Sequence, residues 1–544
     1  MIKSFKSAFI INSITYLLLV FLMILNVLDK CNGNFVYSLD DAYIHLSIAK
    51  NLAFHNVWGV SNFEFSSASS SPAYTLLLSF VINLVGNNQL LPLILNVLAS
   101  LLCFFELKNI SRILGFTPKL YLLLGLILNI VLPFYYLTFQ GMEHIFQCYF
   151  LLLFLKFSLN LLNKSNDKFD KNSILTLLFG ALSVSFRYES IFFILPICII
   201  LLYQQKYVNS IIIFILSILP ILIFGLFFIS KGGFFLPYSI LAKSNGFSLS
   251  PDKLLFYFQN MFFQFKKNPL ILSLISINLY ILLKDIQSKS FNNEIKNFVL
   301  LNLAIIISIS LHTFLASILY QFRYEAYLVL IDTLIIFHRI IFDKLSNHLT
   351  KTILFKLLIL STFCFLGLRV YKTVNFAIFS SQNIFEQQIQ MSKFINTYYQ
   401  NSVIYANDIG AISFFNNFKL IDLAGLSNKE ICLNISENNK RRIMYKPNLT
   451  QIENNRIKLY DSINSFNNGN GIAITYKNWY PRVLPKSWIE CGTWTLENNI
   501  ACGDKTVTFY ACSINEKVRL LNSLKEFSKT LPISVIQEGI YLKN

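Results

Sequence analysis

Residues 8–28 read AFIINSITYLLLVFLMILNVL, a mostly apolar run that is long enough to cross a bilayer as a helix. Lys3 and Lys6 precede this run, and basic residues beside a membrane span stay in the cytoplasm. The run is too long for a signal peptide and lacks a small-residue cleavage site, so we expect it to remain as an anchor. The sequence therefore predicts a cytoplasmic N-terminus and an emergence after residue 28 on the outer side.

The composition indicates that most of the chain, and not only its first segment, lies in a membrane. Of 544 residues, 54% are hydrophobic and only 14% are charged, whereas soluble domains carry about 25% charged residues. Together these features predict a polytopic α-helical membrane protein with about eleven transmembrane helices. The apolar runs lie at 8–28, 89–106, 120–137, 144–162, 172–186, 190–204, 209–229, 268–283, 297–317, 326–341 and 352–370.

The formal net charge of +18 has two interpretations. Basic residues that collect in cytoplasmic loops explain most of it, and affinity for anionic lipid phosphates is the alternative. Placing loops such as 108–119 and 164–171 inside requires an odd number of crossings, which leaves the C-terminus outside. No basic and aromatic soluble module occurs, so nucleic acid is not expected as a partner.

Residues 72–86 are apolar but too few to span a bilayer in the usual way. If they crossed, every later basic loop would lie outside. We therefore expect a helix embedded in the outer leaflet, preceded by an amphipathic helix over 40–55. An ordinary short span is the alternative.

From about residue 377 the apolar runs shorten to strand length. Strands are expected at 402–406, 418–423 and 471–476, with a helix over 385–399. We predict a transmembrane catalytic domain over 1–376, with its first outer loop at 29–88, and a small extracytoplasmic α/β domain over 377–544. The cysteines of this tail are Cys432, Cys491, Cys502 and Cys512. An oxidising compartment would permit a disulfide among the last three of them, and the pairing stays open.

Two adjacent carboxylates, Asp40 and Asp41, follow the first span at the predicted outer surface. One carboxylate there can take a proton from an acceptor hydroxyl, and Asp41 is slightly favoured. Helix capping is the alternative role for the pair. His45, one turn after Asp41, is a candidate ligand for a divalent metal, with a hydrogen-bonded packing role as the alternative.

Further charged residues fall in the predicted outward loops. An ionised side chain near the bilayer core costs about 2.5–3.5 kcal/mol, so such residues tend to face a functional cavity. Cations can bind a lipid phosphate, although ion pairing and contact with lipid headgroups are alternative roles. The candidate substrate-binding residues are Glu64, Glu143, Arg187, Lys243, Arg323 and Tyr324. Asp408 and Asp422 are interpreted instead as turn acids of the outer domain.

The chain resembles the GT-C glycosyltransferases, especially bacterial membrane arabinofuranosyl- and mannosyltransferase-like proteins. The first outer loop carries the resemblance with Asp40-Asp41-Ala42-Tyr43-Ile44, Ala49-Lys50-Asn51-Leu52, Asn62-Phe63-Glu64 and Ser69-Ser70-Ser71-Pro72. Later motifs in the same order are Gly141-Met142-Glu143, Arg187-Tyr188-Glu189, Leu236-Pro237 with Lys243, Arg323-Tyr324, 407–412 and 421–426. One departure is 65–68, Phe-Ser-Ser-Ala, where the family has a glycine-rich turn, so the acceptor side differs.

The resemblance implies an enzyme of the bacterial inner membrane. It would transfer a sugar from a polyprenyl-phosphate donor to a glycan, lipid or protein acceptor outside the cytoplasm. The transfer would invert the anomeric carbon, with an aspartate of the first loop as the general base. A transporter or flippase for a lipid-linked sugar is the alternative, disfavoured because the charges concentrate on one side rather than at the midplane. A non-catalytic scaffold would have no use for the acidic pair.

Overall fold

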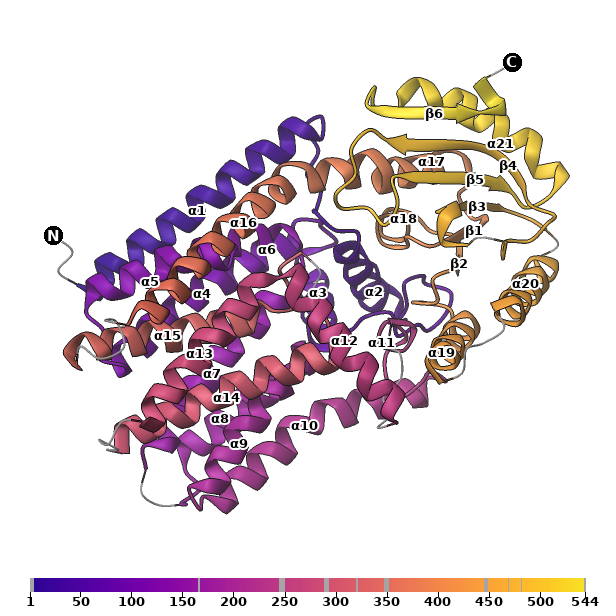
Figure 1. Cartoon of the computed structure of the whole chain (residues 1–544). Helices are drawn as coiled ribbons and strands as arrows, with labels where there is room; N and C mark the ends of the chain where they lie inside the picture. The colour runs from indigo at the N-terminus through magenta and orange to yellow at the C-terminus, as the bar shows by residue number, and fades with distance from the viewer. Residues whose placement is uncertain are drawn as a thin grey trace. The chain divides into compact units, whose positions relative to one another are not determined.

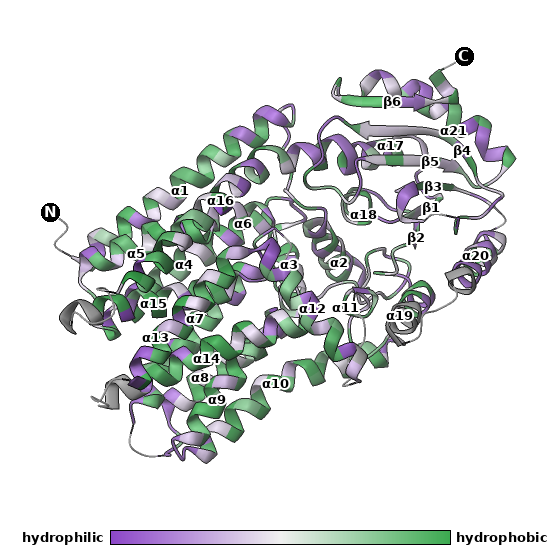
Figure 2. Ribbon diagram, in the orientation of Figure 1, coloured by the Kyte–Doolittle hydropathy of each residue, from purple (hydrophilic) through white to green (hydrophobic). Residues whose placement is uncertain are grey.

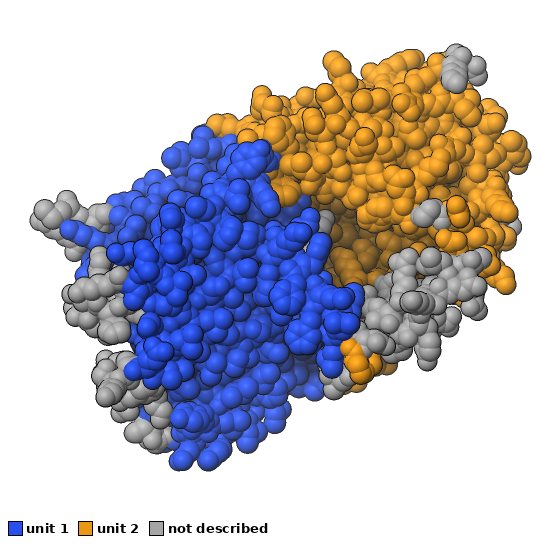
Figure 3. Space-filling view, in the orientation of Figure 1, with its two compact units in different colours: residues 1–23, 93–223, 254–375 blue, residues 24–92, 224–253, 376–544 orange. Residues whose placement is uncertain are grey.

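The computed structural model describes residues 4–542, apart from 165–166, 244–249, 288–292, 319–320, 347–351, 445–448, 468 and 481. Lys3, cited for the N-terminal orientation, and the C-terminal residue Asn544 lie outside this part of the chain. The chain divides into two compact units, each assembled from three segments (Figure 3). Unit 1 comprises 1–23, 93–223 and 254–375, and unit 2 comprises 24–92, 224–253 and 376–544.

Seven helices are long and apolar enough to cross a membrane, within the described ranges. They are Phe5–Lys30 (α1), Leu91–Ile113 (α4), His144–Leu162 (α7), Tyr207–Ser230 (α10), Pro269–Gln287 (α13), Asn297–Leu315 (in α14, Asn293–Leu315) and Ile353–Tyr398 (from α16, Ile353–Ile384, through α17). The protein is therefore a multi-pass membrane protein by the length and composition of its helices.

The surfaces of these helices are apolar as well (Figure 2). Leu18 and Phe21 of α1, Leu226 of α10 and Phe363 of α16 are 54–65% exposed. Large apolar side chains grouped at this exposure are typical of a surface that faces lipid. Association with a bilayer follows from these helices.

The prediction of about eleven spans was wrong, because four of the apolar runs do not make full-length apolar helices. Three form shorter helices: α5 (Pro118–Val131), α8 (Lys171–Phe186) and α9 (Ile191–Tyr203). Thr117 and Asp170 cap α5 and α8 at their first turns, and α8 already ends before Arg187. The fourth, α15 (Ala326–Ser346), is long enough, but Asp332 and Arg339 interrupt its apolar run.

The first outer loop folds into two helices joined by residues 56–71. The stretch predicted to be amphipathic forms α2 (Asp41–His55), and the short apolar segment forms α3 (Pro72–Val85). Pro72 occupies the first turn of α3, where its missing N–H costs nothing, and Gly86 follows the last turn. Both helices are confirmed, but α2 is not amphipathic, because all residues from Ala42 to Ala49 are buried. The depth of α3 in the membrane stays a prediction.

Unit 2 contains a six-stranded mixed sheet in the order β2-β1-β3-β5-β4-β6 (Figure 1). The predicted strands are β1 (Val403–Ala406), β2 (Lys419–Asp422) and β3 (Ile472–Thr475), and β1 pairs in parallel with both others. Three further antiparallel strands were not predicted: β4 (Ile489–Leu496), β5 (Thr506–Ala511) and β6 (Val535–Gly539). The predicted helix over 385–399 is confirmed as a π-helical turn, η2 (Phe385–Ile389), followed by α17 (Gln390–Tyr398).

Alternate residues of the strands pack on the two faces of this sheet. Ile404 belongs to the apolar cluster of one face together with Phe394 of α17 and Leu524 of α21 (Ile514–Phe527). Tyr405, the next residue, belongs to the cluster of the other face with Tyr460 of α20 (Leu449–Phe466). Helices cover both faces, so the parallel strands are buried on both sides.

All nine cysteines are free thiols. Cys491 and Cys512 are buried, and Cys502 is partly buried. The structure therefore forms none of the disulfides that the outer compartment would permit.

Candidate functional site

Several polar residues of unit 2 follow the carboxyl ends of the parallel strands. Asn407 and Asp408 come directly after β1, and Tyr476 comes directly after β3. The chain passes from β1 to β2 on one side and then returns to β3 on the other, so β1 and β3 flank a topological switch point. In sheets of this kind, ligands bind outside the carboxyl ends of the strands at the switch point.

Hydrogen bonds fix the Asp408 carboxylate at this edge. Its Oδ2 accepts a hydrogen bond from the Tyr476 hydroxyl and another, 2.6 Å long, from Nε2 of Gln388 in η2. Asn407 accepts from the Tyr476 backbone N–H at 2.9 Å, which ties the end of β1 to the end of β3. Oδ2 of Asp408 is therefore held by two side chains, one from η2 and one from the residue that follows β3.

The Asp40 carboxylate reaches the same edge from the first outer loop. Its two oxygens accept the backbone N–H groups of Gly410 and Ala411 at 2.7 and 2.8 Å, at the start of α18 (Gly410–Phe415). Lys50 donates to the carbonyl of Phe414 at 2.6 Å, near the other end of α18. An acid at the N-terminus and a base at the C-terminus both complement the helix dipole.

Gly410 makes this approach between α18 and Asp40 feasible. A Cβ at position 410 would lie 2.1 Å from the Asp40 carbonyl oxygen and 2.7 Å from its Cγ. No side chain fits at that distance. The glycine is required because another backbone approaches it closely.

Three carboxylates thus gather in one place: Asp40, Asp41 and Asp408. Burial raises the pKa of Asp40 to about 8, and the nearby Asp408 carboxylate adds to this shift against the two backbone N–H donors. Burial also raises the pKa of Asp408, with the charge of Asp41 contributing. We call Asp40, Asp41, Asp408, Gln388 and Tyr476 the acidic junction.

The two adjacent aspartates differ in their surroundings. Both oxygens of Asp40 accept backbone hydrogen bonds, as in a helix cap, although the capped helix is α18 and not its own. Asp41 is the first residue of α2, and Asp40 and Asp41 are both partly exposed. Because both oxygens of Asp40 already accept backbone hydrogen bonds, Asp41 is kept as the predicted general base.

The other predicted site residues of unit 2 are exposed or serve packing. Glu64 is exposed in the loop between α2 and α3, and Lys243 is the exposed last residue of α11 (Tyr238–Lys243). His45 is buried, with Nδ1 at 3.2 Å from the hydroxyls of both Ser69 and Thr75. Among the described residues, no group of three His, Cys, Asp or Glu side chains is arranged to hold a metal ion.

Unit 1 brings four of the predicted residues together. Arg187 forms a 2.9 Å ion pair with Glu143 and a second ion pair with Glu189. The Tyr324 ring lies close to two guanidinium groups, 5.1 Å from that of Arg187 and 4.9 Å from that of Arg323. Arg323 is only 1% exposed and donates to the Tyr324 hydroxyl at 3.2 Å.

A further ion pair in unit 1 was not predicted. Arg369 of α16 pairs with Glu325 at 2.8 Å, and both side chains are almost fully buried. Glu325 directly follows Arg323-Tyr324 in the sequence, and this position could have marked it as a partner for a buried arginine. Arg369 gave no such signal, because it was counted within the apolar run 352–370. The three buried arginines are matched in number by Glu143, Glu189 and Glu325.

Sequence analysis also missed the roles of three residues of the acidic junction. Asp408 was interpreted as a turn acid, and Gln388 and Tyr476 were not considered. The segment 407–412 was recognised only as a motif. Nothing in the sequence indicated that this segment lies beside Asp40, because Asp40 and Gly410 are 370 positions apart in the chain.

Comparison with known proteins adds one finding for the outer region. A family model described as "Domain of unknown function (DUF8728)" matches residues 382–510. The matched region contains Gln388, Asp408 and Tyr476 but neither Asp40 nor Asp41. No curated protein matches the chain.

Proposed function

We propose that the protein is a membrane glycosyltransferase of the GT-C kind, with Asp41 as its general base. The observation that carries this proposal is the acidic junction. A partly buried carboxylate at the head of α2 lies beside two further carboxylates at a topological switch point, in a chain that also has seven candidate spans. In this proposal the donor is a sugar on a polyprenyl phosphate and the acceptor lies outside the cytoplasm of a bacterial cell.

The proposed reaction is a single displacement. The Asp41 carboxylate takes the proton of an acceptor hydroxyl as its oxygen forms a bond to the anomeric carbon of the sugar. The bond from that carbon to the phosphate oxygen breaks, and polyprenyl phosphate leaves with the bonding electrons. The configuration at the anomeric carbon is inverted because attack and departure occur on opposite faces.

The buried arginines divide into two roles in this proposal. The charge of Arg187 is already engaged by two carboxylates, so Arg187 positions Tyr324 and the helix ends around it. Arg323 and Lys243 bind the negative charge that develops on the phosphate, with Arg323 suited by the fork of its guanidinium group.

A flippase for a lipid-linked sugar is the second candidate. The buried ion pairs of unit 1 favour it, because charged groups at membrane depth also mark the paths of transported ions and lipids. The two functions differ in whether the bond between sugar and phosphate is broken.

The test uses the purified full chain in proteoliposomes that contain polyprenyl-phosphate hexoses and pentoses, one at a time. A glycosyltransferase releases polyprenyl phosphate in the presence of a membrane extract as acceptor source, as measured by mass spectrometry. A flippase moves the intact donor between leaflets and leaves the bond whole. If the intact donor moves between leaflets and no donor releases polyprenyl phosphate, the second candidate replaces the proposed function.

A further inference from the structure

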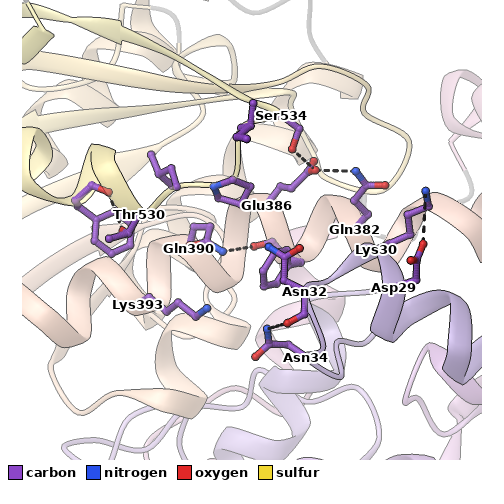
Figure 4. Close-up of a pocket in the computed structure, with 15 residues that line it drawn as sticks. Asp29, Lys30, Asn32, Asn34, Gln382, Glu386, Gln390, Lys393, Thr530 and Ser534 are labelled. Carbon is purple, nitrogen blue, oxygen red and sulfur yellow. Dashed lines mark hydrogen bonds and ion pairs between the residues drawn. The ribbon is translucent and has the colours of Figure 1, made fainter.

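A cavity of about 600 Å³ opens within unit 2 (Figure 4). Three stretches of the chain line it: the end of α1 with the turn that follows, the continuous helix from α16 into α17, and the segment between α21 and β6. This volume lies within the range of about 300–1,000 Å³ that is typical of small-molecule sites. The acidic junction does not use any of these lining residues.

The helical wall of the cavity carries a row of polar side chains. Gln382, Glu386, Gln390 and Lys393 recur every three or four residues and so share one side of the helix. Glu386 accepts hydrogen bonds through Oε1 from Gln382, at 2.7 Å, and from the hydroxyl of Ser534 across the cavity (Figure 4). The π-helical turn η2 lies within this row, and turns of that kind are frequent at functional sites.

The formal charges around the cavity cancel. Asp29 and Glu386 are acidic, Lys30 and Lys393 are basic, and Lys30 lies 3.9 Å from Asp29. A site for a phosphate or a metal ion would need an excess of one sign. The balance favours a ligand without net charge.

The uncharged lining residues indicate what kind of neutral ligand fits. Four amide side chains and two hydroxyls line the cavity: Asn32, Asn34, Gln382, Gln390, Thr530 and Ser534. Amides and hydroxyls both donate and accept hydrogen bonds, as sugar hydroxyls do. Phe385 and Phe527 also line the cavity, but they are only 3% and 6% exposed, so hydrogen bonds rather than ring stacking would hold the ligand.

We propose that this cavity binds a short uncharged oligosaccharide, the glycan part of the acceptor. The binding claim stands on the cavity alone, while the role as acceptor rests on the proposed function. The cavity and Asp41 belong to the same compact unit.

The test measures binding of four neutral trisaccharides to the purified full chain in nanodiscs by saturation-transfer NMR. The trisaccharides are α-linked glucose, β-linked glucose, α-linked mannose and β-linked N-acetylglucosamine, with sialyllactose as the charged comparison. At least one neutral trisaccharide should bind with a Kd of about 1–10 mM, and sialyllactose should bind more weakly. Failure of all four neutral ligands, or tighter binding of sialyllactose, would overturn the proposal.

A pair of neighbouring substitutions locates the binding. Thr530 is exposed and lines the cavity, and Lys529 is exposed and does not. Thr530→Trp places a large ring in the cavity and should weaken binding by about tenfold or more, whereas Lys529→Trp should leave the Kd within about twofold. Equal effects of the two variants would place the ligand elsewhere.

The same preparation separates the two proposals. Trisaccharide binding without any turnover of donor would retain the cavity as a sugar site and remove the proposed function. Donor turnover with no trisaccharide binding would retain the enzyme and remove the cavity proposal. If Thr530→Trp also lowers transfer while donor binding is unchanged, the bound glycan is the acceptor.

Discussion

Asp40 and Asp41 are neighbours in sequence, yet the structure gives their carboxylates different tasks. Both oxygens of Asp40 accept backbone N–H groups of α18, and Asp41 is the first residue of α2; both side chains are partly exposed. The sequence located the pair, and its place at an outer surface stays a prediction. The sequence did not separate the two residues, because the partner of Asp40 lies hundreds of positions away in the chain.

The raised pKa of Asp40 makes stability depend on pH. Its ordinary value is 3.8 and its value in the folded protein is about 8, so between these limits the folded form retains a proton that the unfolded form has lost. The free energy of unfolding contributed by this group therefore falls as the pH rises from about 4 to 8. Thermal unfolding of the full chain in detergent at pH 5 and pH 8.5 measures it. The wild type should lose more stability than Asp40→Asn between these values, and parallel losses would contradict the prediction.

Arg323 and Lys243 are predicted to bind the phosphate of the donor. Arg323→Ala or Lys243→Ala should weaken donor turnover by about 1.5–3 kcal/mol for each charged hydrogen bond lost. If Lys243 only contacts lipid headgroups and the buried Arg323 only packs against Tyr324, activity should stay nearly constant. Lys231→Ala, at another exposed lysine of the same outer segment, is the matched control for Lys243→Ala. Unaltered turnover in both test variants would remove these residues from the site.

Among the elements, α18 depends most on a single residue. Gly410→Ala places a methyl group 2.1 Å from the Asp40 carbonyl oxygen, so α18 and Asp40 must move apart. We expect a loss of about 1–3 kcal/mol in the free energy of unfolding from crowding alone. Gly367→Ala in α16 is the control, because its added Cβ meets nothing within 4 Å. Equal unfolding temperatures for the two variants would contradict the close contact.

Burial explains why β1, β2 and β3 were predicted and β4 was not, but it does not explain why β5, which is also largely buried, was missed. β1, β2 and β3 are parallel, largely buried on both faces and therefore nearly continuous in apolar residues. β4 alternates more between buried and partly exposed positions and includes Cys491-Gly492, where its register with β5 shifts. An interrupted pattern of that kind is hard to distinguish from a loop in sequence.

For the helices the error was the opposite one, because more membrane spans were predicted than the described residues provide. Apolar composition marks α5, α8 and α9 as strongly as the seven longer helices. The runs 172–186 and 190–204 nearly match the bounds of α8 and α9, so the error was to count such short segments as spans. α5 ends at Val131, before the predicted end at 137, and Pro133 follows it.

At the scale of the whole molecule, the basic loops predict one orientation. The segment before α4 and the C-terminal region should lie outside, and the loop before α8 should lie inside. Single cysteines replacing Asn88, Lys529 and Lys164 report it in intact cells, in a background with the exposed Cys364 changed to Ser. An impermeant thiol reagent should label positions 88 and 529 and not 164. Labelling only at 164 would overturn the orientation.

The assembly of unit 2 was beyond sequence analysis. Its three segments come from 24–92, 224–253 and 376–544, and no local pattern shows that the first outer loop and the C-terminal sheet share a core. Residues such as Ile48 and Trp58 pack in the same apolar cluster as Phe394 of α17. The candidate site was therefore predicted as a set of residue types, and its arrangement comes from the fold.

The most direct test of the account is transfer by Asp41→Asn under single-turnover conditions with donor already bound. Asparagine keeps the size of the side chain but cannot take the proton, so transfer should fall by about 10²–10⁴-fold at unchanged donor affinity and protein level. A capping role for Asp41 predicts a nearly silent change, because Asn caps a helix as well as Asp does. Full transfer activity in Asp41→Asn would contradict the claim that this carboxylate is the general base.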